Sequence, residues 1–190
     1  VVHPPVAVQD FAPLPIAELG EFYLWAGELA PYKRPDLAVK AFRLMNKPLV
    51  VIGGPKKTSA ALQAIAGDKT HFLGQVPFEV LKTYMAGCKA LIFPGEEDFG
   101  MVPVEVMASG RPVIAYGRGG ALDTVIDGKT GLLFRDQSVD GLVAAVERFE
   151  SLGLDDLDPL ALVNHAKRFD EAAFQTGIAL CLGKLGVSLP

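Results

Sequence analysis

Residues 92–110 read IFPGEEDFGMVPVEVMASG, and this segment decides how the rest of the chain is interpreted. It starts inside a short apolar run, Ala90–Pro94, and continues through an acidic loop that contains glycine. It then enters an apolar stretch, Pro103–Ala108, whose leading proline suits the first turn of a helix. The segment therefore predicts a buried strand, a polar loop and a helix, in that order.

The same order recurs on both sides of this segment. The apolar runs are continuous rather than alternating, which is typical of strands buried on both faces of a parallel sheet. The predicted strands are Phe22–Gly27, Leu49–Gly53, Thr70–Gly74, Ala90–Pro94, Val113–Tyr116 and Gly131–Phe134. The predicted helices are Asp36–Met45, Ser59–Ala66, Phe78–Ala86, Pro103–Ala108, Ala121–Ile126, Val139–Glu150 and a last stretch from about Leu160 to Leu185. This alternation predicts an α/β fold, a Rossmann-like parallel sheet flanked by helices on both faces.

Composition limits the class of protein. The 190 residues correspond to one domain with a small appendage, and 18 basic against 22 acidic side chains give a net charge of −4. This charge argues against a protein that coats nucleic-acid phosphates. Cys88 and Cys181 are too few and too far apart for a disulfide framework or a zinc knuckle, so each is expected to be a small buried residue. The sequence contains no run of eighteen apolar residues, so it predicts no transmembrane helix.

The first twenty residues differ from the rest. Prolines at positions 4, 5, 13 and 15 predict an irregular arm, because proline fixes φ and removes a hydrogen-bond donor. The start, Val1–Pro5, has neither the basic region nor the apolar core of a signal peptide, and it lacks an initiator methionine. We therefore expect residues 1–20 to be a linker or arm and residues 21–190 to be the domain, with further chain upstream.

The loops directly after the strands are the candidate ligand sites, because ligands of such sheets bind beyond the carboxyl ends of the strands. The first loop, Gly27–Asp36, carries Lys33 and Arg34 where a strand meets a helix. A lysine there is placed to neutralise a phosphate, and the helix start adds N–H donors. For this loop alone, a solvated pair of cations is the better interpretation. Loop 53–57 is glycine-containing but lacks the G-x-G-x-x-G pattern.

The acidic loop is more informative. Gly100 allows a ligand to approach the backbone, and Met101 and Val102 would offer N–H groups at a helix start. If the helix begins near Val102, Glu105 lies in its first turn and faces the cleft. Together with Glu97 it suits a ligand with both hydroxyls and phosphates, because carboxylates accept from hydroxyls and amides donate to phosphate. Solvated acids that only support the helix are the alternative.

Other chemistries find less support. The turn 116–123 contains three glycines around Arg118, which fits either a phosphate or a plain structural turn. His71 is expected in a strand and His165 on a helix surface, and no histidine spacing matches a zinc motif. There is no G-x-S-x-G elbow, and Cys88 has no histidine nearby in sequence, so a nucleophilic serine or cysteine is not indicated.

Taken together, these pieces resemble a known family. They are the opening G-x-L-x-P-Y-K-R-x-D-L-A from Gly27, the stretch Phe72–Val76, the Glu97-x7-Glu105 motif with Ala108–Ala115, Gly119-Gly120, and Asp127–Phe134. Their order resembles the carboxy-terminal, donor-binding domain of retaining group 1 glycosyltransferases of GT-B fold, over about Tyr23 to Glu150. The opening is similar to that of mannosyltransferase-like members.

The resemblance implies roles for individual residues. Glu97 would meet the hydroxyls of the donor sugar, and Lys33 would bind the diphosphate and offset charge on the leaving group; these two are the predicted catalytic residues. Glu105 would accept from the ribose hydroxyls, and Val76 would lie against the nucleobase. The remaining predicted donor-binding residues are Gly27, Arg34, Phe99, Gly100, Met101 and Val102.

One departure from the family matters. The family usually has arginine directly after the glycine of the first strand, and here the residue is Glu28. A carboxylate cannot replace a guanidinium fork on a diphosphate. Either Arg34 or Arg118 supplies the missing charge, or phosphate binding is weaker.

The resemblance also implies a function. It is transfer of a hexose, with mannose favoured, from a GDP- or UDP-linked sugar to a glycan or lipid-linked acceptor, without a metal or another cofactor. An absent amino-terminal domain would hold the acceptor, so the isolated domain is expected to be inactive. We expect the protein in the cytoplasm, with peripheral association of the full-length protein with the inner membrane face left open. The alternatives are a non-catalytic nucleotide-binding or oligomerisation module and a GT-B nucleotide-sugar epimerase or phosphorylase.

Overall fold

The central element is a parallel sheet, as predicted. The structure is a computed structural model that describes residues 1–54 and 56–186. In these residues, six strands pair in the order β3-β2-β1-β4-β5-β6, and every pairing is parallel. The strands are β1 (Tyr23–Ala26), β2 (Leu49–Ile52), β3 (Thr70–Gly74), β4 (Leu91–Phe93), β5 (Val113–Tyr116) and β6 (Gly131–Phe134). Each lies within the range expected from its apolar run.

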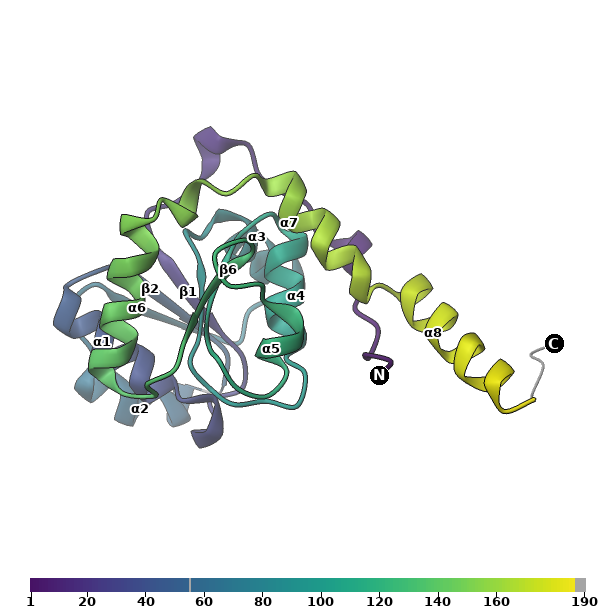
Figure 1. The fold of residues 1–190 in the computed structure, drawn as a ribbon. Helices are drawn as coiled ribbons and strands as arrows, with labels where there is room; N and C mark the ends of the chain where they lie inside the picture. Colours follow the sequence, from purple (N-terminus) through teal and green to yellow (C-terminus); the bar gives the residue numbers. More distant parts are fainter. Residues whose placement is uncertain (55, 187–190) are drawn as a thin grey trace.

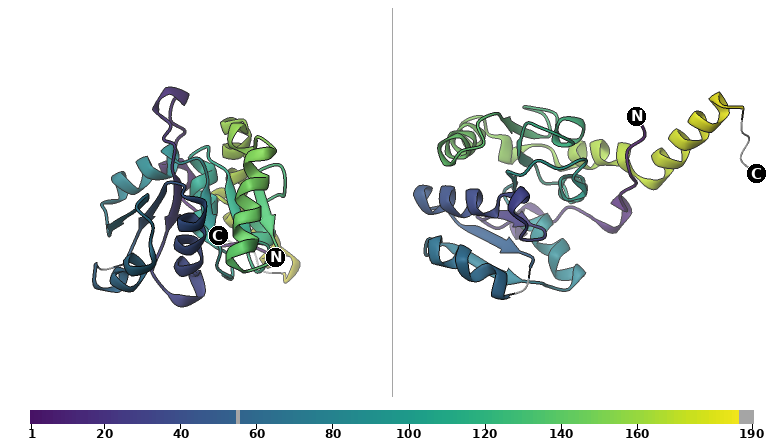
Figure 2. Two further views of the ribbon diagram at one scale, coloured as in Figure 1. Left: turned by 90° about the vertical axis from the view of Figure 1, so that its left-hand side faces the viewer. Right: turned by 90° about the horizontal axis from the view of Figure 1, so that it is seen from below.

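Helices cover both faces of this sheet (Figures 1 and 2). Helices α1 (Pro35–Met45), α2 (Lys56–Ile65) and α6 (Val139–Ser151) lie on one face, and α3 (Phe78–Gly87), α4 (Met101–Ala108), α5 (Ala121–Thr124) and α7 (Pro159–Ala166) on the other. Successive side chains of a strand point to opposite faces. In β1, Tyr23 and Trp25 accordingly pack with α1 and α6, whereas Leu24 and Ala26 pack with α4. Two separate apolar cores result, which explains why the strands are apolar at every position.

The carboxy-terminal part differs from the single stretch expected over 160–185. It consists of α7, a 3-10 turn (Lys167–Phe169) and α8 (Glu171–Lys184), which projects away from the sheet (Figure 1). The break occurs at Asp170, whose Oδ1 accepts from the backbone N–H of Ala173 at 2.7 Å and so starts a new helix. The arm, by contrast, is irregular as expected, apart from 3-10 turns at Val8–Asp10 and Ile16–Glu18.

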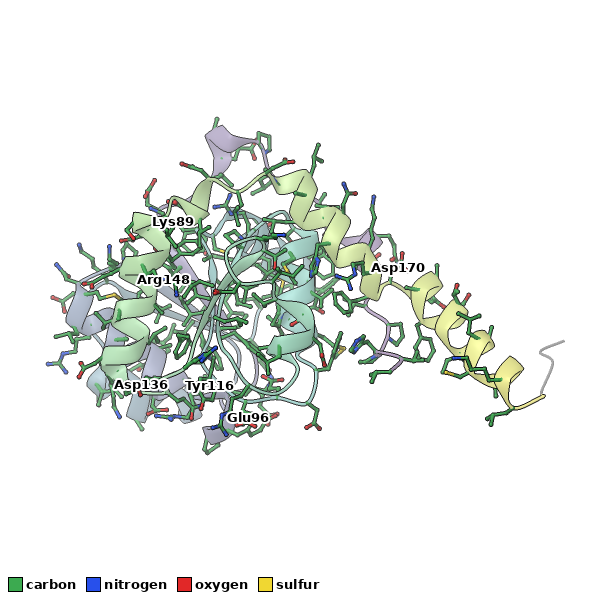
Figure 3. The ribbon with its side chains drawn as sticks, in the orientation of Figure 1. Lys89, Glu96, Tyr116, Asp136, Arg148 and Asp170 are labelled. Carbon is green, nitrogen blue, oxygen red and sulfur yellow. The ribbon has the colours of Figure 1, made fainter. Side chains whose placement is uncertain are left out.

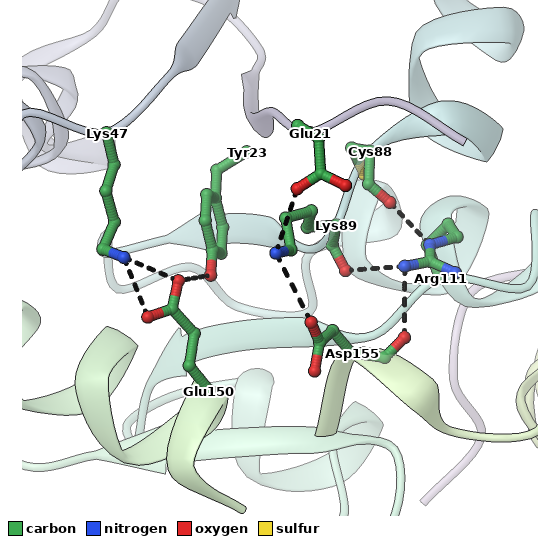
Figure 4. A network of polar contacts seen from close by, with 8 residues as sticks. All are labelled: Glu21, Tyr23, Lys47, Cys88, Lys89, Arg111, Glu150 and Asp155. Carbon is green, nitrogen blue, oxygen red and sulfur yellow. Dashed lines mark hydrogen bonds and ion pairs between the residues drawn. The ribbon is translucent and has the colours of Figure 1, made fainter. Parts of the chain in front are cut away.

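A polar network holds the amino ends of the strands (Figure 4). Arg111, only 5% exposed, donates to the carbonyl oxygens of Cys88, Lys89 and Asp155. Nearby, the Tyr23 hydroxyl donates to Glu150 at 2.8 Å, and Lys47 also binds Glu150. Burial and the Glu150 carboxylate raise the pKa of Tyr23. Figure 3 shows Lys89 of this network at the opposite end of the sheet from Glu96 and Asp136. The network therefore belongs to the structural end of the sheet.

Two residue-level expectations were wrong. Cys88 is buried as expected, but Cys181 is exposed on α8. His165 is buried rather than on the helix surface, and its Nε2 lies 2.7 Å from the carbonyl oxygen of Thr124. Across the described residues, no helix combines the length and apolarity needed to cross a membrane.

Candidate functional site

The sheet has one switch point, between β1 and β4. The chain after β1 enters α1 on one face, and the chain after β4 enters α4 on the other, so their loops diverge and leave a crevice. Across it, Lys33 Nζ lies 2.9 Å from Glu97 Oε1, with the two side chains 16% and 17% exposed. The structure thus brings together the two predicted catalytic residues, 64 positions apart in sequence.

Glycines allow the loops to come this close. A Cβ on Gly95 would lie 2.6 Å from the Cα of Lys33, and one on Gly120 would lie 2.2 Å from the Cα of Phe99. The N–H of Gly120 also donates to the carbonyl oxygen of Glu97 at 2.8 Å. The turn after β5 therefore supports the acidic loop from behind. These contacts give the turn a structural role, and whether it also binds a phosphate stays open, as it was from the sequence.

The start of α4 faces this crevice. The helix begins at Met101, two residues before the predicted start at Pro103, after Gly100 in the left-handed region (φ 79°), and no side chain caps it. The N–H groups of a first helical turn lack partners within the helix, so those of Met101 and Val102 are available to an anion, as the sequence predicts. Glu105 falls in the second turn rather than the first. It is partly exposed between buried Val104 and Val106, and burial raises its pKa.

Two pockets flank the Lys33–Glu97 pair. One, of about 450 Å³, is lined by Gly27, Glu28, Ile52, Gly53, Gly54, Gln75, Val76 and Leu81. The other, of about 570 Å³, is lined by Pro4, Tyr32, Glu96, Glu97, Asp98, Phe99, Gly100 and Met101. Of the eight predicted donor-binding residues, two line the smaller pocket (Gly27 and Val76) and three the larger (Phe99, Gly100 and Met101). Arg34, Val102 and Glu105 are in neither lining, and neither is Lys33. A hollow of about 610 Å³ at the β6 edge of the sheet contains none of them.

The cations near the site differ in availability. The guanidinium of Arg34 is held by Asp36, with Nε 3.0 Å from Oδ1 and Nη2 3.3 Å from Oδ2. Although burial alone would raise the pKa of Asp36, Arg34 and Lys40 hold it below its usual value. Arg118 is exposed. Among the described residues no group of three or more His, Cys, Asp or Glu side chains is arranged to hold a metal ion.

The amino-terminal arm contributes to the site, which sequence reasoning missed. Pro4 lines the larger pocket, and the ring of His3 stacks on Phe99 with centroids 5.4 Å apart. Only the spacing of prolines marked this segment, and that pattern indicates an irregular arm without saying where it lies. No local sequence signal could have placed it against a loop more than ninety residues away.

Comparison with known proteins gives a consistent family. The family model described as "Glycosyl transferases group 1" matches residues 8–176. The D-inositol 3-phosphate glycosyltransferase of Kribbella flavida is 30% identical over 209 aligned positions, which cover 94% of this chain and 49% of that protein. The enzyme of the same name from Streptomyces avermitilis is 31% identical over 162 positions, covering 70% of this chain and 35% of its own length. The chain thus spans about a third to a half of the curated relatives it matches.

Solved structures agree on the fold. A sucrose-phosphate synthase (tll1590) from Thermosynechococcus elongatus superposes with a TM-score of 0.79 at 25% identity, covering 96% of this chain and 51% of that one. Anabaena Alr3699/HepE in complex with UDP and glucose superposes with a TM-score of 0.79 at 20% identity, covering 97% of this chain and 56% of that one. The second likeness concerns the fold alone.

Proposed function

Because the chain belongs to the group 1 glycosyltransferases, we propose that it binds the nucleotide-sugar donor of a retaining hexosyltransferase. The transfer runs from a nucleoside-diphosphate sugar to a glycan or lipid-linked acceptor. The observation that carries this proposal is the Lys33–Glu97 pair at the switch point, with a pocket on either side. A donor has three parts (base, diphosphate and sugar), and the crevice offers three adjacent regions of matching character.

Each region suits one part of the donor. The smaller pocket has Val76, Leu81 and Ile52 in its lining, which favour the flat apolar face of a base. The centre holds Lys33 and the free N–H groups at the start of α4, which favour the diphosphate. The larger pocket is rich in carboxylates, Glu96 to Asp98, which accept hydrogen bonds from sugar hydroxyls.

The same groups account for catalysis. As the bond between the anomeric carbon and the diphosphate oxygen breaks, positive charge develops on the sugar ring and negative charge on the leaving diphosphate. The Lys33 ammonium and the amides of Met101 and Val102 stabilise the negative charge. Glu97 orients the sugar through its hydroxyls, and its carboxylate favours the cationic ring. Lys33 therefore exchanges Glu97 for the diphosphate when the donor binds.

Glu28 is the main objection. Its carboxylate is exposed in the lining of the smaller pocket, where it disfavours a nearby diphosphate. This single residue favours the second candidate, a nucleotide-binding module without transfer activity on the same scaffold. Exchange of Lys33 or Glu97 for alanine, in this chain joined to an acceptor-binding domain, separates the two candidates, because only an enzyme loses a transfer activity.

Calorimetric titration of this chain tests the binding proposal. UDP and UDP-glucose are the first ligands, because Alr3699/HepE has been solved with them; GDP and GDP-mannose follow, because of the mannosyltransferase-like opening, and ADP is the comparison. We expect micromolar binding of at least one diphosphate and preference for one base. If no ligand gives heat at protein concentrations that detect micromolar binding, the proposal is wrong.

A further inference from the structure

Three aromatic rings from distant parts of the chain meet beside the acidic loop. His3 comes from the arm, Phe99 from the loop and Phe169 from the turn between α7 and α8. The ring of His3 stacks on Phe99 (5.4 Å between centroids, 23° between planes) and meets the edge of Phe169 at 5.5 Å. Phe99 and Phe169 are themselves 5.6 Å apart. Each ring contacts both others, so none moves without disturbing the other two.

The backbone fixes the arm in this position. The N–H of Val6 donates to the carbonyl oxygen of Phe169 at 2.9 Å, and Val6 is only 3% exposed. Nearer the terminus, the side chain of Val2 packs against α8 at Gly177, where an added Cβ would lie 3.0 Å from it. His3 lies between these two anchors, and Pro4 beside it lines the larger pocket. The arm is therefore held on both sides of His3 and forms part of the lining of the larger pocket.

Phe99 controls the part of the loop that matters for an anion. It is followed by Gly100 at φ 79°, which leads into the first amides of α4. A glycine at positive φ gives the backbone freedom that only its neighbours restrict. One side of Phe99 is restricted by Gly120, which leaves no room for a Cβ, and the other side by the ring of His3.

We propose that His3 is a positioning residue of the donor site, whose ring, stacked on Phe99, fixes the direction of the α4 amides. His3 itself is partly exposed, so its contribution is to the loop rather than to the stability of the core. Its effect on nucleotide binding rests on the proposed function, whereas its effect on the loop does not.

The test compares three variants of this chain. His3→Ala removes the ring, His3→Phe keeps a ring that can stack, and His71→Ala is the matched control, an exposed histidine on β3. Hydrogen exchange of the amides of residues 97–102 reports on the loop, and titration with UDP and GDP reports on binding. Far-UV circular dichroism and urea unfolding confirm that each variant is folded.

We expect His3→Ala to speed exchange at residues 97–102 and to weaken binding about 3- to 10-fold, the size of one aromatic contact. His3→Phe and His71→Ala should match the parent in both measurements. Unchanged exchange in His3→Ala, or equal effects of His3→Ala and His3→Phe, would overturn the proposal. If the parent chain binds neither nucleotide, the proposed function fails, and the exchange data still decide whether His3 positions the loop.

Discussion

Lys33 illustrates how a single residue gains meaning from its position. Its ammonium lies at the crevice between two loops, partly shielded from water and in contact with Glu97 at 2.9 Å. Lys40, in the same part of the chain, also pairs with a carboxylate, but its side chain is 49% exposed. Exposed pairs contribute little because water and salt screen them, whereas a shielded lysine can bind an anion strongly.

Replacing Lys33 by alanine should weaken binding of the preferred nucleoside diphosphate about 10- to 100-fold. A hydrogen bond to a charged group contributes about 1.5–3 kcal/mol, which corresponds to this range. Titration calorimetry measures the change, and Lys40→Ala is the control that should bind as the parent does. Equal losses in both variants would show that only overall charge matters.

His165 should make the free energy of unfolding depend on pH. Burial and the nearby Arg168 lower its pKa, although the Thr124 carbonyl acts in the opposite direction. The unfolded chain takes up a proton near pH 6.5 and the folded chain only at lower pH, so the unfolded state binds more protons between these values. The contribution of His165 to the free energy of unfolding is fully present above pH 7 and is lost as the pH drops below 6.5. The total loss is about 1.4 kcal/mol for each unit by which the pKa of His165 differs between the folded and unfolded states.

Urea unfolding between pH 7.5 and pH 5 measures this dependence. His165→Asn keeps a side-chain donor for Thr124 but does not titrate, so its stability should depend less on pH in this window. His71→Ala, which removes an exposed histidine, should retain the dependence of the parent. The same slope in His165→Asn as in the parent would exclude His165 as the cause.

The burial of His165 was not predictable from its neighbours in sequence. Its partner Thr124 lies 41 positions earlier, and only the packing of α7 against the rest of the fold brings them together. The proximity of Lys33 and Glu97 was easier to predict, because parallel strands end at the same edge of a sheet and each of these residues follows the end of a strand. Residues near strand ends could therefore be predicted as a site, whereas contacts made by peripheral helices could not.

At the scale of elements, the acidic loop depends on the turn after β5. Gly120 has ordinary backbone angles (φ −64°), so alanine there would suffer only from lack of space. A Cβ would lie 2.2 Å from the Cα of Phe99, and backbone atoms cannot move away cheaply. The loop itself must shift.

Gly120→Ala should therefore displace residues 97–100 and impair nucleotide binding about tenfold or more, with a loss of stability of about 1–3 kcal/mol typical of overpacking. Titration and urea unfolding measure the two effects. Gly183→Ala is the control, because nothing lies within 4 Å of a Cβ at that helical position. Gly183→Ala should bind the nucleotide as the parent chain does. If Gly120→Ala also binds as the parent does, the turn after β5 does not support the acidic loop as described.

Arg111 joins elements at the opposite end of the sheet. Its buried guanidinium donates to carbonyl oxygens in the connection before β4 and in the segment after α6. Arg111→Ala leaves these oxygens without their donor and should lower the free energy of unfolding by about 2–4 kcal/mol. Denaturant unfolding tests this against Arg148→Ala, an exposed arginine whose loss should stay within about 0.5 kcal/mol.

The elements were predictable to different degrees for physical reasons. The strands are buried on both faces, so their apolarity is continuous and marks them clearly. The break between α7 and α8 was missed because apolar residues occur on both sides of it. Its signal was Asp170, a helix-capping residue followed by Glu171, which an interpretation based on apolar spacing alone overlooks.

At the scale of the whole molecule, the strand order β3-β2-β1-β4-β5-β6 explains why the candidate site residues Lys33 and Glu97 meet at one crevice. A change of direction between β1 and β4 separates the two loops, and the amino-terminal arm, through His3, and the turn between α7 and α8, through Phe169, both contact one of these loops at Phe99. The alternation of strands and helices predicts a parallel sheet with right-handed crossovers, but more than one strand order satisfies these rules, so the order itself was not predictable from the sequence. This meeting of the arm and the α7–α8 turn is a tertiary feature that no periodicity encodes.

Binding of a nucleotide should raise the free energy of unfolding of this fold. At 100 times its dissociation constant, a ligand that binds only the folded state adds about 2.7 kcal/mol of stability, which raises the melting temperature of a domain of this size by about 5–10 °C. Differential scanning calorimetry with the preferred nucleotide measures the shift, and Lys33→Ala should reduce it at the same ligand concentration.

Transfer of the sugar should require chain beyond these residues. The chain spans about half or less of its curated relatives, and the lining of its larger pocket comes from Pro4 of the arm, Tyr32 and the acidic loop. For transfer, the acceptor hydroxyl must be held next to the anomeric carbon of the donor sugar, and positioning of this kind supplies much of the rate. We therefore expect the chain alone to bind UDP-glucose or GDP-mannose and to form no product with D-inositol 3-phosphate or a glycan acceptor. A protein in which this chain is joined to an acceptor-binding domain should form product, and Glu97→Gln in it should abolish transfer while preserving nucleotide binding. Product formation by the chain alone, followed by chromatography of the radiolabelled sugar, would show that the acceptor site lies within these residues.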